Sequence, residues 1–283
     1  MAVPTESAFR PESVGQRFPP DTIEVTPELI TNYAHAVNDY NPRYYNEKNS
    51  PALIAPPMFG IVPAMRVLRT AMESGLLPIS QSRTLHLEQE MHFITPILPG
   101  DQLRSHGKVQ RVDQHSTGST IDIVVTTRST TNAIRVLQKI TLFEWEAKKT
   151  TALKNSSIFR QPKYVENVYI TDDQPFRYAR ASFTEGIRPH EDHKFAQSLG
   201  YRTYFLQGQC TMAFAAKAIV DGLAGRNPER LQKLKTHFAQ VVYPRETLTT
   251  RIWEEQVPGK YAFETTKKDG TLALTQGTAL ISI

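Results

Sequence analysis

A small set of residues recurs along this chain at one fixed displacement of 145 residues. The recurring residues are His92-Phe93, Pro99 and Leu103, which return as His237-Phe238, Pro244 and Leu248, and Tyr33-Ala34-His35-Ala36, which returns as Tyr178-Ala179-Arg180-Ala181. Two separate segments that share one displacement are harder to obtain by chance than either match alone, and self-similarity at a fixed spacing indicates repeated structural units. The sequence therefore predicts a tandem duplication.

Length and composition agree with two packed globular units. The 283 residues exceed the usual size of one hydrophobic core, so we predict a first unit at 1–150 and a second at 151–283. No apolar run reaches the roughly 20 residues that cross a bilayer, and residues 1–20 lack the apolar stretch of a secretory signal. The single cysteine, Cys210, excludes an internal disulfide. We expect a soluble, cytoplasmic protein with no membrane span.

Both units show the same order of predicted elements. Thr26 and Pro27 form a good helix start, because Thr is a favoured N-cap and Pro is favoured at the first helical position. In the first unit we predict helices at 26–37 and 59–73 and strands at 84–93, 102–111, 120–128 and 133–145. After a polar connection at 147–163, we predict helices at 176–181, 194–198 and 209–223 and strands at 233–242, 247–255, 262–266 and 272–283.

A long apolar helix before an antiparallel meander has a simple packing solution, in which the sheet wraps the helix and covers its apolar faces. Two such units can join edge to edge and hide strand edges that would otherwise invite aggregation. The predicted fold class is therefore α+β, with two tandem units.

The charge distribution suggests a phosphate-bearing partner. Residues 1–150 carry 15 Lys/Arg and 15 Asp/Glu, whereas residues 151–283 carry 18 and 13, so the second unit holds the whole net charge of +5. Such an excess suits coenzyme A or an acidic carrier protein, although a solvated face with no special partner explains it equally well. The sequence contains no zinc-type spacing, P-loop or G-x-G-x-x-G motif, and its basic residues do not form a stripe with aromatic residues. We expect no metal, no cofactor and no nucleic-acid partner.

The first unit contains the motifs Asp39-Tyr40-Asn41-Pro42-Arg43-Tyr44 and Ala55-Pro56-Pro57-Met58-Phe59. These motifs resemble those of the MaoC-like double hot-dog family of (R)-specific enoyl-thioester hydratases and dehydratases. They match the D-x-N-P and A-P-P-x-F patterns of the family's degenerate first hot-dog unit, which has Tyr where the catalytic unit has His. The resemblance implies a double hot-dog fold, with a first unit that shapes an acyl pocket at Met58 and Phe59. Core packing explains these two residues equally well.

The second unit resembles the family's catalytic unit, whose pattern is Y-A-x-x-S-G-D-x-N-P-x-H followed by an apolar H-G-x-x-T. The matching residues are Tyr178-Ala179, Glu185, His190, Asp192, Phe195-Ala196, Gly200 and Gln207-Gly208-Gln209-Cys210-Thr211. The spacing from Glu185 to His190 equals the family's Asp-to-His spacing, with one residue inserted relative to the first unit. The chain departs from the pattern where Glu185 replaces Asp, Ile187 replaces Asn, Arg188 replaces Pro and Gln207 replaces His.

The resemblance assigns roles to five residues of the second unit. Glu185 and His190 would form an acid–base pair at the β-carbon of an enoyl thioester. The amides of Gly208 and Gln209, at a helix start, would stabilise the enolate oxygen, and Gln207 would line the pocket. A solvated cluster of charges is the alternative for Glu185 and His190. We expect Cys210, His92 and His237 to serve in packing and Asp192 to be a helix N-cap. For Asp39 and Asn41 we expect a structural role in their loop.

Several functions follow from this resemblance. The first is hydration of an enoyl-CoA or enoyl-carrier-protein thioester, or dehydration of the 3-hydroxyacyl thioester, in fatty acid or polyketide metabolism. The altered motif leaves open that another nucleophile, such as an amine, is added in specialised biosynthesis, or that the protein only binds acyl thioesters. A hot-dog thioesterase fits the motif order less well. Monomer and homodimer are both compatible with a chain that already holds two units.

Overall fold

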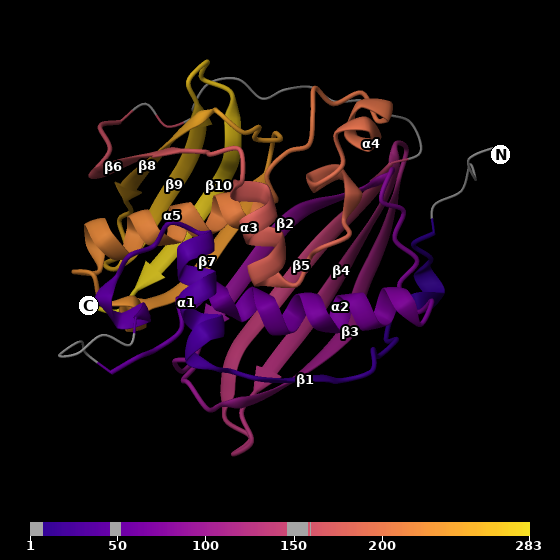
Figure 1. Ribbon diagram of the computed structural model, residues 1–283, viewed down its shortest axis with the longest axis horizontal. Coiled ribbons are helices and arrows are strands. Elements are labelled where there is room, and N and C mark those ends of the chain that lie inside the picture. Colours follow the sequence, from indigo (N-terminus) through magenta and orange to yellow (C-terminus); the bar gives the residue numbers. More distant parts are fainter. Residues whose placement is uncertain (1–7, 46–51, 146–157, 159) are drawn as a thin grey trace.

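The computed structural model describes residues 8–45, 52–145, 158 and 160–283, which form one large sheet with its helices on one side (Figure 1). The sheet has ten strands in the order β1-β3-β4-β5-β2-β7-β10-β9-β8-β6, and all neighbouring pairs are antiparallel. The first unit contributes β1 (Asp21–Glu24), β2 (Thr84–Phe93), β3 (Gln102–His115), β4 (Gly118–Arg128) and β5 (Ile134–Trp145). The second contributes β6 (Tyr164–Tyr169), β7 (Leu231–Phe238), β8 (Thr247–Glu254), β9 (Lys260–Lys267) and β10 (Leu272–Ile281).

The long helices of the two units cover the same face of this sheet. Helix α2 (Ile61–Glu73) packs on β1, β3 and β4, and α5 (Gly208–Leu223) packs on β6, β7, β8 and β10 (Figure 1). The shorter helices are α1 (Pro27–Ala36), α3 (Gln174–Ser182) and α4 (His193–Ser198). None of the helices in the described ranges is long and apolar enough to cross a membrane. Each long helix is thus wrapped by the strands of its own unit, as predicted.

The two units are related by an approximate twofold axis that runs through the seam between β2 and β7. Glu90 pairs with Lys235 in the middle of that seam, and the two residues are separated by the repeat displacement of 145. The repeated tyrosines, Tyr33 of α1 and Tyr178 of α3, also meet each other, with ring centroids 6.0 Å apart. Residues related by the duplication therefore face one another at the junction, which is the geometry of a hot-dog dimer contained in one chain.

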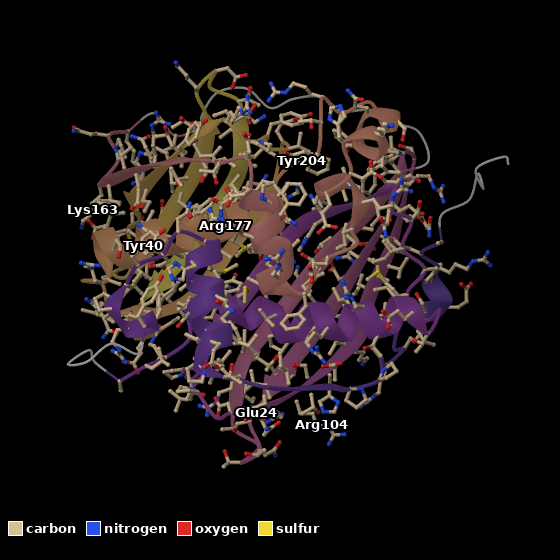
Figure 2. The ribbon with its side chains drawn as sticks, viewed as in Figure 1. Glu24, Tyr40, Arg104, Lys163, Arg177 and Tyr204 are labelled. Carbon is tan, nitrogen blue, oxygen red and sulfur yellow. The ribbon has the colours of Figure 1, made fainter. Side chains whose placement is uncertain are left out.

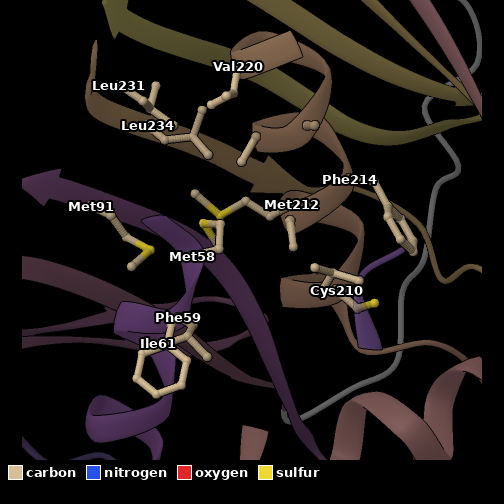
Figure 3. Packing of buried hydrophobic residues seen from close by; sticks show 14 of the residues in the cluster. Met58, Phe59, Ile61, Met91, Cys210, Met212, Phe214, Val220, Leu231 and Leu234 are labelled. Carbon is tan, nitrogen blue, oxygen red and sulfur yellow. The ribbon is translucent and has the colours of Figure 1, made fainter. Parts of the chain in front are cut away.

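One hydrophobic core extends across this junction. Met58 and Met91 of the first unit and Met212 and Leu234 of the second belong to the same buried cluster, and none of them is more than 2% exposed (Figure 3). On the sheet face away from the helices, Glu90 bonds to Lys233 at 2.7 Å. Burial of shared apolar surface, supported by the β2–β7 hydrogen bonds, holds the two units together.

Local signals in the sequence predicted most of these elements. Thr26 caps α1 by accepting a hydrogen bond from the Leu29 amide, and Asp192 caps α4 in the same way through the Phe195 amide. Strand β2 has the predicted bounds, β3 extends to residue 115, and β7 ends at 238 rather than 242. The short strands β1 and β6 were not predicted. The boundary proposed between residues 150 and 151 lies outside the described residues, so the exact division stays a prediction.

The shared core predicts that the two units unfold together. Each unit carries one of the chain's two tryptophans, Trp145 in β5 and Trp253 in β8. The fluorescence of a Trp253→Phe variant therefore reports on the first unit, and that of a Trp145→Phe variant reports on the second. We expect the fluorescence midpoint in urea to match the circular-dichroism midpoint in both variants. Met91→Ala should lower both midpoints by an amount that corresponds to about 2–5 kcal/mol, because it opens a cavity at the seam. Val165→Ala, at an exposed position, is the control. Separate midpoints for the two tryptophans would contradict the single core.

Candidate active site

A loop from each unit lies over the long helix of the other unit. The second-unit loop, residues 183–192, is held on the first unit by Arg69 of α2, whose Nη2 donates to the Glu185 carbonyl at 2.5 Å. The Gln81 side chain also accepts a hydrogen bond from the Arg188 amide at 3.0 Å. The first-unit loop, residues 38–45, is held in turn by Asn41, whose Nδ2 donates to the Arg226 carbonyl at 2.8 Å. Each loop site is therefore built from both units.

The backbone shows which residues of the two loops correspond. Asn38 and Phe183 both follow a helix in the left-handed region, with φ of 52° and 57°. The next residues, Asp39 and Thr184, both donate their amide to a carbonyl five residues earlier at 2.9 Å. Both side chains are buried, at 5% and 2% exposure. Thr184 therefore occupies the place of Asp39, and a one-residue insertion follows before the loops match again.

At the other end of the loop, His190 corresponds to Tyr44 of the first unit. It ends the 3-10 helix η4 (Arg188–His190), as Tyr44 ends η2 (Pro42–Tyr44) in the first unit. Tyr44 of the first-unit loop is fully buried, and its pKa is raised well above the usual value by burial and then by the charge of Asp39. Asp39 and Tyr44 belong to one small loop, because Asn41 donates its amide to Asp39 Oδ1 and accepts the Tyr44 amide at its carbonyl.

The imidazole of His190 is neutral and has a defined tautomer. Its Nδ1 lies 2.8 Å from the Phe205 carbonyl, which can only accept, so Nδ1 carries the hydrogen. The ring also packs edge-on against the Phe205 ring at 4.8 Å. Burial lowers the pKa of His190 to about 4, although the hydrogen bond to Phe205 opposes this shift. At neutral pH the Nε2 atom is therefore the basic nitrogen.

Glu185 lies at the surface. Its side chain is exposed, and its main-chain carbonyl accepts the hydrogen bond from Arg69. The residue that follows, Gly186, donates its amide to Glu191 at 2.8 Å and shapes the turn. The structure thus places the two predicted acid–base residues in different environments, with His190 half-buried and Glu185 in solvent. The catalytic role of Glu185 stays a prediction.

The start of α5 supplies two amides, three and four residues after Phe205, the hydrogen-bond partner of His190. Gly208 and Gln209 occupy the first turn of α5, whose amides have no acceptor within the helix, while Cys210 and Thr211 donate to the Gln207 carbonyl. Gly208 follows Phe205, the partner of His190, by three residues. A Cβ at position 208 would lie 2.8 Å from the Phe238 ring, so only glycine fits.

The side chains at this helix start close the site against the first unit. Gln209 Nε2 lies 3.3 Å from the Met65 sulfur of α2. Gln207 is buried and donates to the Pro175 carbonyl at 3.1 Å, while its Oε1 has no hydrogen-bond partner among the described residues. A buried acceptor of this kind can bind a donor on a ligand or a water molecule. The predicted pocket role of Gln207 stays a prediction.

Met58 and Phe59 lie in the packed core rather than on an open surface. Met58 packs near Met212 and Met91, and Phe59 contacts Tyr33 edge-on with ring centroids 5.6 Å apart (Figure 3). An apolar groove of about 50 Å³ opens beside the preceding residues. It is lined mainly by Ile54, Ala55, Pro56, Pro57, Phe93, Ile94, Ile97, Val136 and Leu231. The assignment of Met58 and Phe59 to an acyl pocket stays a prediction.

The first-unit loop forms a second, polar site that the sequence analysis did not identify. A cavity of about 250 Å³ lies between this loop, β6 and α5, and its lining residues include exposed Tyr40, labelled in Figure 2, and buried Phe214. In its wall Lys217 Nζ bonds to Glu166 at 2.6 Å and to Asp221 at 2.8 Å. The spacing of Lys217 and Asp221, one turn apart in an otherwise apolar helix, was the available signal.

Asp39 beside this cavity is an unusual carboxyl group. Burial raises its pKa to about 7, and the neighbouring charges of Asp221 and Glu166 raise it further than Lys217 lowers it. Its Oδ1 accepts a hydrogen bond from the Asn41 amide at 3.2 Å. No group of three or more His, Cys, Asp or Glu in the described part of the chain is arranged to hold a metal ion.

The raised pKa of Asp39 predicts a pH-dependent stability. The folded state holds this proton more tightly than the unfolded state, so stability falls as the pH rises from about 4 to about 7. Asp39→Asn keeps an acceptor for the Asn41 amide but removes the buried charge. We expect it to raise the free energy of unfolding at pH 8 by about 2–4 kcal/mol and to leave it nearly unchanged at pH 4. Urea titrations at both pH values measure this, with exposed Glu12→Gln as the control. A variant less stable at pH 8 would contradict the assignment.

Comparisons with known proteins agree with this architecture. Residues 12–136 match the family described as "FAS1-like, dehydratase domain region", and residues 154–277 match the "MaoC like domain". The chain is 30% identical over 124 residues to "Probable enoyl-CoA hydratase 2" of Dictyostelium discoideum, which is 43% of this chain and 41% of the relative. It is 26% identical over 247 residues to "Peroxisomal multifunctional enzyme type 2" of Drosophila melanogaster, covering 81% of this chain and 41% of the relative. The chain thus spans about two fifths of these curated relatives.

A solved structure matches nearly the whole chain. The crystal structure of a "MaoC-like dehydratase" from Phytophthora capsici shares a TM-score of 0.81 and 18% identity, over 97% of this chain and 98% of that one. The continuous sheet, the two wrapped helices and the loop sites that both units build define a double hot-dog protein. With both units matched by dehydratase-type families, the chain belongs to the MaoC-like double hot-dog family. The predicted family and fold are confirmed.

Proposed function

We propose that this protein is a hydratase or dehydratase that interconverts an enoyl thioester and a 3-hydroxyacyl thioester at the second-unit loop. The observation that carries the proposal is the neutral His190 imidazole, which is bonded through Nδ1 to Phe205 close to the start of α5. Relatives named as enoyl-CoA hydratases point to the same substrate class. Fold alone does not decide the reaction, and the argument therefore rests on these groups.

The arrangement fits the chemistry of hydration. Nε2 of His190 takes a proton from water while the water oxygen bonds to the β-carbon, and the electrons of the double bond move toward the thioester carbonyl. The amides of Gly208 and Gln209, at the positive end of α5, stabilise the negative oxygen that forms. The imidazolium then returns the proton to the α-carbon. Dehydration is the reverse sequence, and the protein ends each cycle unchanged.

The shape of the protein also suits an acyl thioester. Met58, Met91 and Met212 lie together in the core (Figure 3), with Met58 directly after Pro57 of the apolar groove, and methionine side chains adapt readily to a ligand. An acyl chain bound there would be shaped by the first unit. The carrier can be coenzyme A or an acyl carrier protein, and both monomer and homodimer stay open. Some relatives are named as peroxisomal, whereas the sequence predicts a cytoplasmic protein, so the location stays a prediction.

Replacement of His190 tests this function. His190→Asn preserves a donor toward the Phe205 carbonyl but removes the base, so we expect kcat/KM for hydration of crotonyl-CoA or a longer enoyl-CoA to fall by at least about 100-fold. The loss of thioester absorbance measures the rate. His193→Ala, at an exposed position on α4, is the matched control and should retain activity.

The pH profile of kcat/KM is a second test of the same proposal. Because burial lowers the pKa of His190 to about 4, kcat/KM of the unaltered protein should stay high down to about pH 5 and fall only below it. An acid limb near pH 6.5, the ordinary range of histidine, would contradict a buried neutral base. No turnover with CoA or carrier-protein thioesters of any chain length would contradict the function itself.

A further inference from the structure

The position of the buried carboxylate in the first-unit loop is held by a hydroxyl group in the second-unit loop. Thr184 matches Asp39 in backbone conformation, amide hydrogen bond and burial. Glu185 instead matches Tyr40, which is 60% exposed. The residue that sequence spacing assigns as the carboxylate therefore lies one position beyond the buried site.

The hydroxyl of Thr184 has a defined direction. Ser182 Oγ donates its hydrogen to the Tyr178 carbonyl at 2.7 Å, so it accepts from Thr184 Oγ1 across the 2.8 Å that separates them. This bond uses the only hydrogen of the Thr184 hydroxyl. Its lone pairs are left to accept a hydrogen bond from a donor such as a water molecule.

Thr184 and His190 belong to the same small turn. The Ile187 amide donates to the Thr184 carbonyl at 3.4 Å, and the His190 amide donates to the Ile187 carbonyl at 3.0 Å. In the first-unit loop Asn41 likewise links the equivalent residues, because it donates its amide to Asp39 Oδ1 and accepts the Tyr44 amide at its carbonyl. From this correspondence we expect the Thr184 hydroxyl to lie on the same side of the loop as the His190 imidazole.

We propose that Thr184 is a positioning residue that orients the water nucleophile, and that His190 is the only acid–base group of the second-unit site. This inference rests on the proposed hydratase function and assigns Glu185 no part in proton transfer. The water donates one hydrogen to Thr184 Oγ1 and the other to His190 Nε2. The second proton moves to Nε2 as the carbon–oxygen bond forms, and His190 then delivers it to the α-carbon. One imidazole thus serves both halves of the reaction.

Three substitutions separate this arrangement from a carboxylate–imidazole pair. Thr184→Val keeps the shape of the side chain but cannot accept a hydrogen bond, so kcat should fall by about tenfold or more with a smaller change in KM. Thr184→Ser restores the oxygen and should recover kcat to within about threefold of the unaltered protein. Glu185→Gln should leave kcat and the pH profile unchanged.

A matched control shows whether the effect of Thr184→Val is merely structural. Thr127 and Ser105 form a second buried hydroxyl pair at 2.8 Å in the first unit's sheet, so Thr127→Val removes the same kind of contact away from the site. Thermal midpoints of both valine variants should fall by similar amounts, while only Thr184→Val lowers kcat.

The outcomes distinguish this inference from the proposed function. Loss of turnover in Glu185→Gln together with full activity in Thr184→Val would make Glu185 the base and overturn the inference while leaving the hydratase intact. A Thr184→Ser variant as slow as Thr184→Val would also overturn it, because the oxygen would then have no role. If the unaltered protein turns over no enoyl thioester, the function fails and the inference fails with it.

Discussion

The pairing of β2 with β7 is the constraint on which the rest of this structure depends. A five-stranded sheet wrapped round one helix leaves an open strand edge, and the second unit covers the edge of the first through the Glu90–Lys235 register. Once the edges are joined, α1 meets α3, and Arg177 of α3 donates to the His35 carbonyl of α1 at 2.8 Å (Figure 2). The loop after each of these helices then lies over the long helix of the opposite unit, where Arg69 and Arg226 hold the two loops. The site at His190 is therefore a consequence of the seam.

The two loop sites show how a duplicated unit diverges. The first keeps a carboxylate, Asp39, but has Tyr44 in the place of histidine, and the second keeps His190 but has Thr184 in the place of the carboxylate. Burial disfavours the charged form of both groups, so it raises the pKa of Asp39 and lowers the pKa of His190. The first-unit loop is thereby left with a costly buried acid, and the second with a neutral base beside a helix start.

Sequence patterns predicted the architecture because its causes are local. The Thr26 cap, the helical spacing of apolar residues in α2 and the 145-residue repeat each depend on a few neighbouring residues or on simple counting. The short strands β1 and β6 have only four and six residues and pair with distant partners, so the local pattern was too weak to predict them. The site was harder still. Residue spacing predicted Glu185 at the carboxylate position. One inserted residue shifts the register of the loop, and the backbone hydrogen bond of Thr184 shows that Thr184, not Glu185, matches the buried Asp39.

A crystal structure with a non-hydrolysable enoyl-pantetheine analogue would test the central claim most directly, namely that His190 and the start of α5 converge on one thioester. The account predicts the thioester oxygen within hydrogen-bond distance of the Gly208 amide, the β-carbon facing His190 Nε2 and the acyl chain directed toward the first unit. An analogue bound in the cavity beside Asp39, with His190 touching nothing but Phe205, would contradict it.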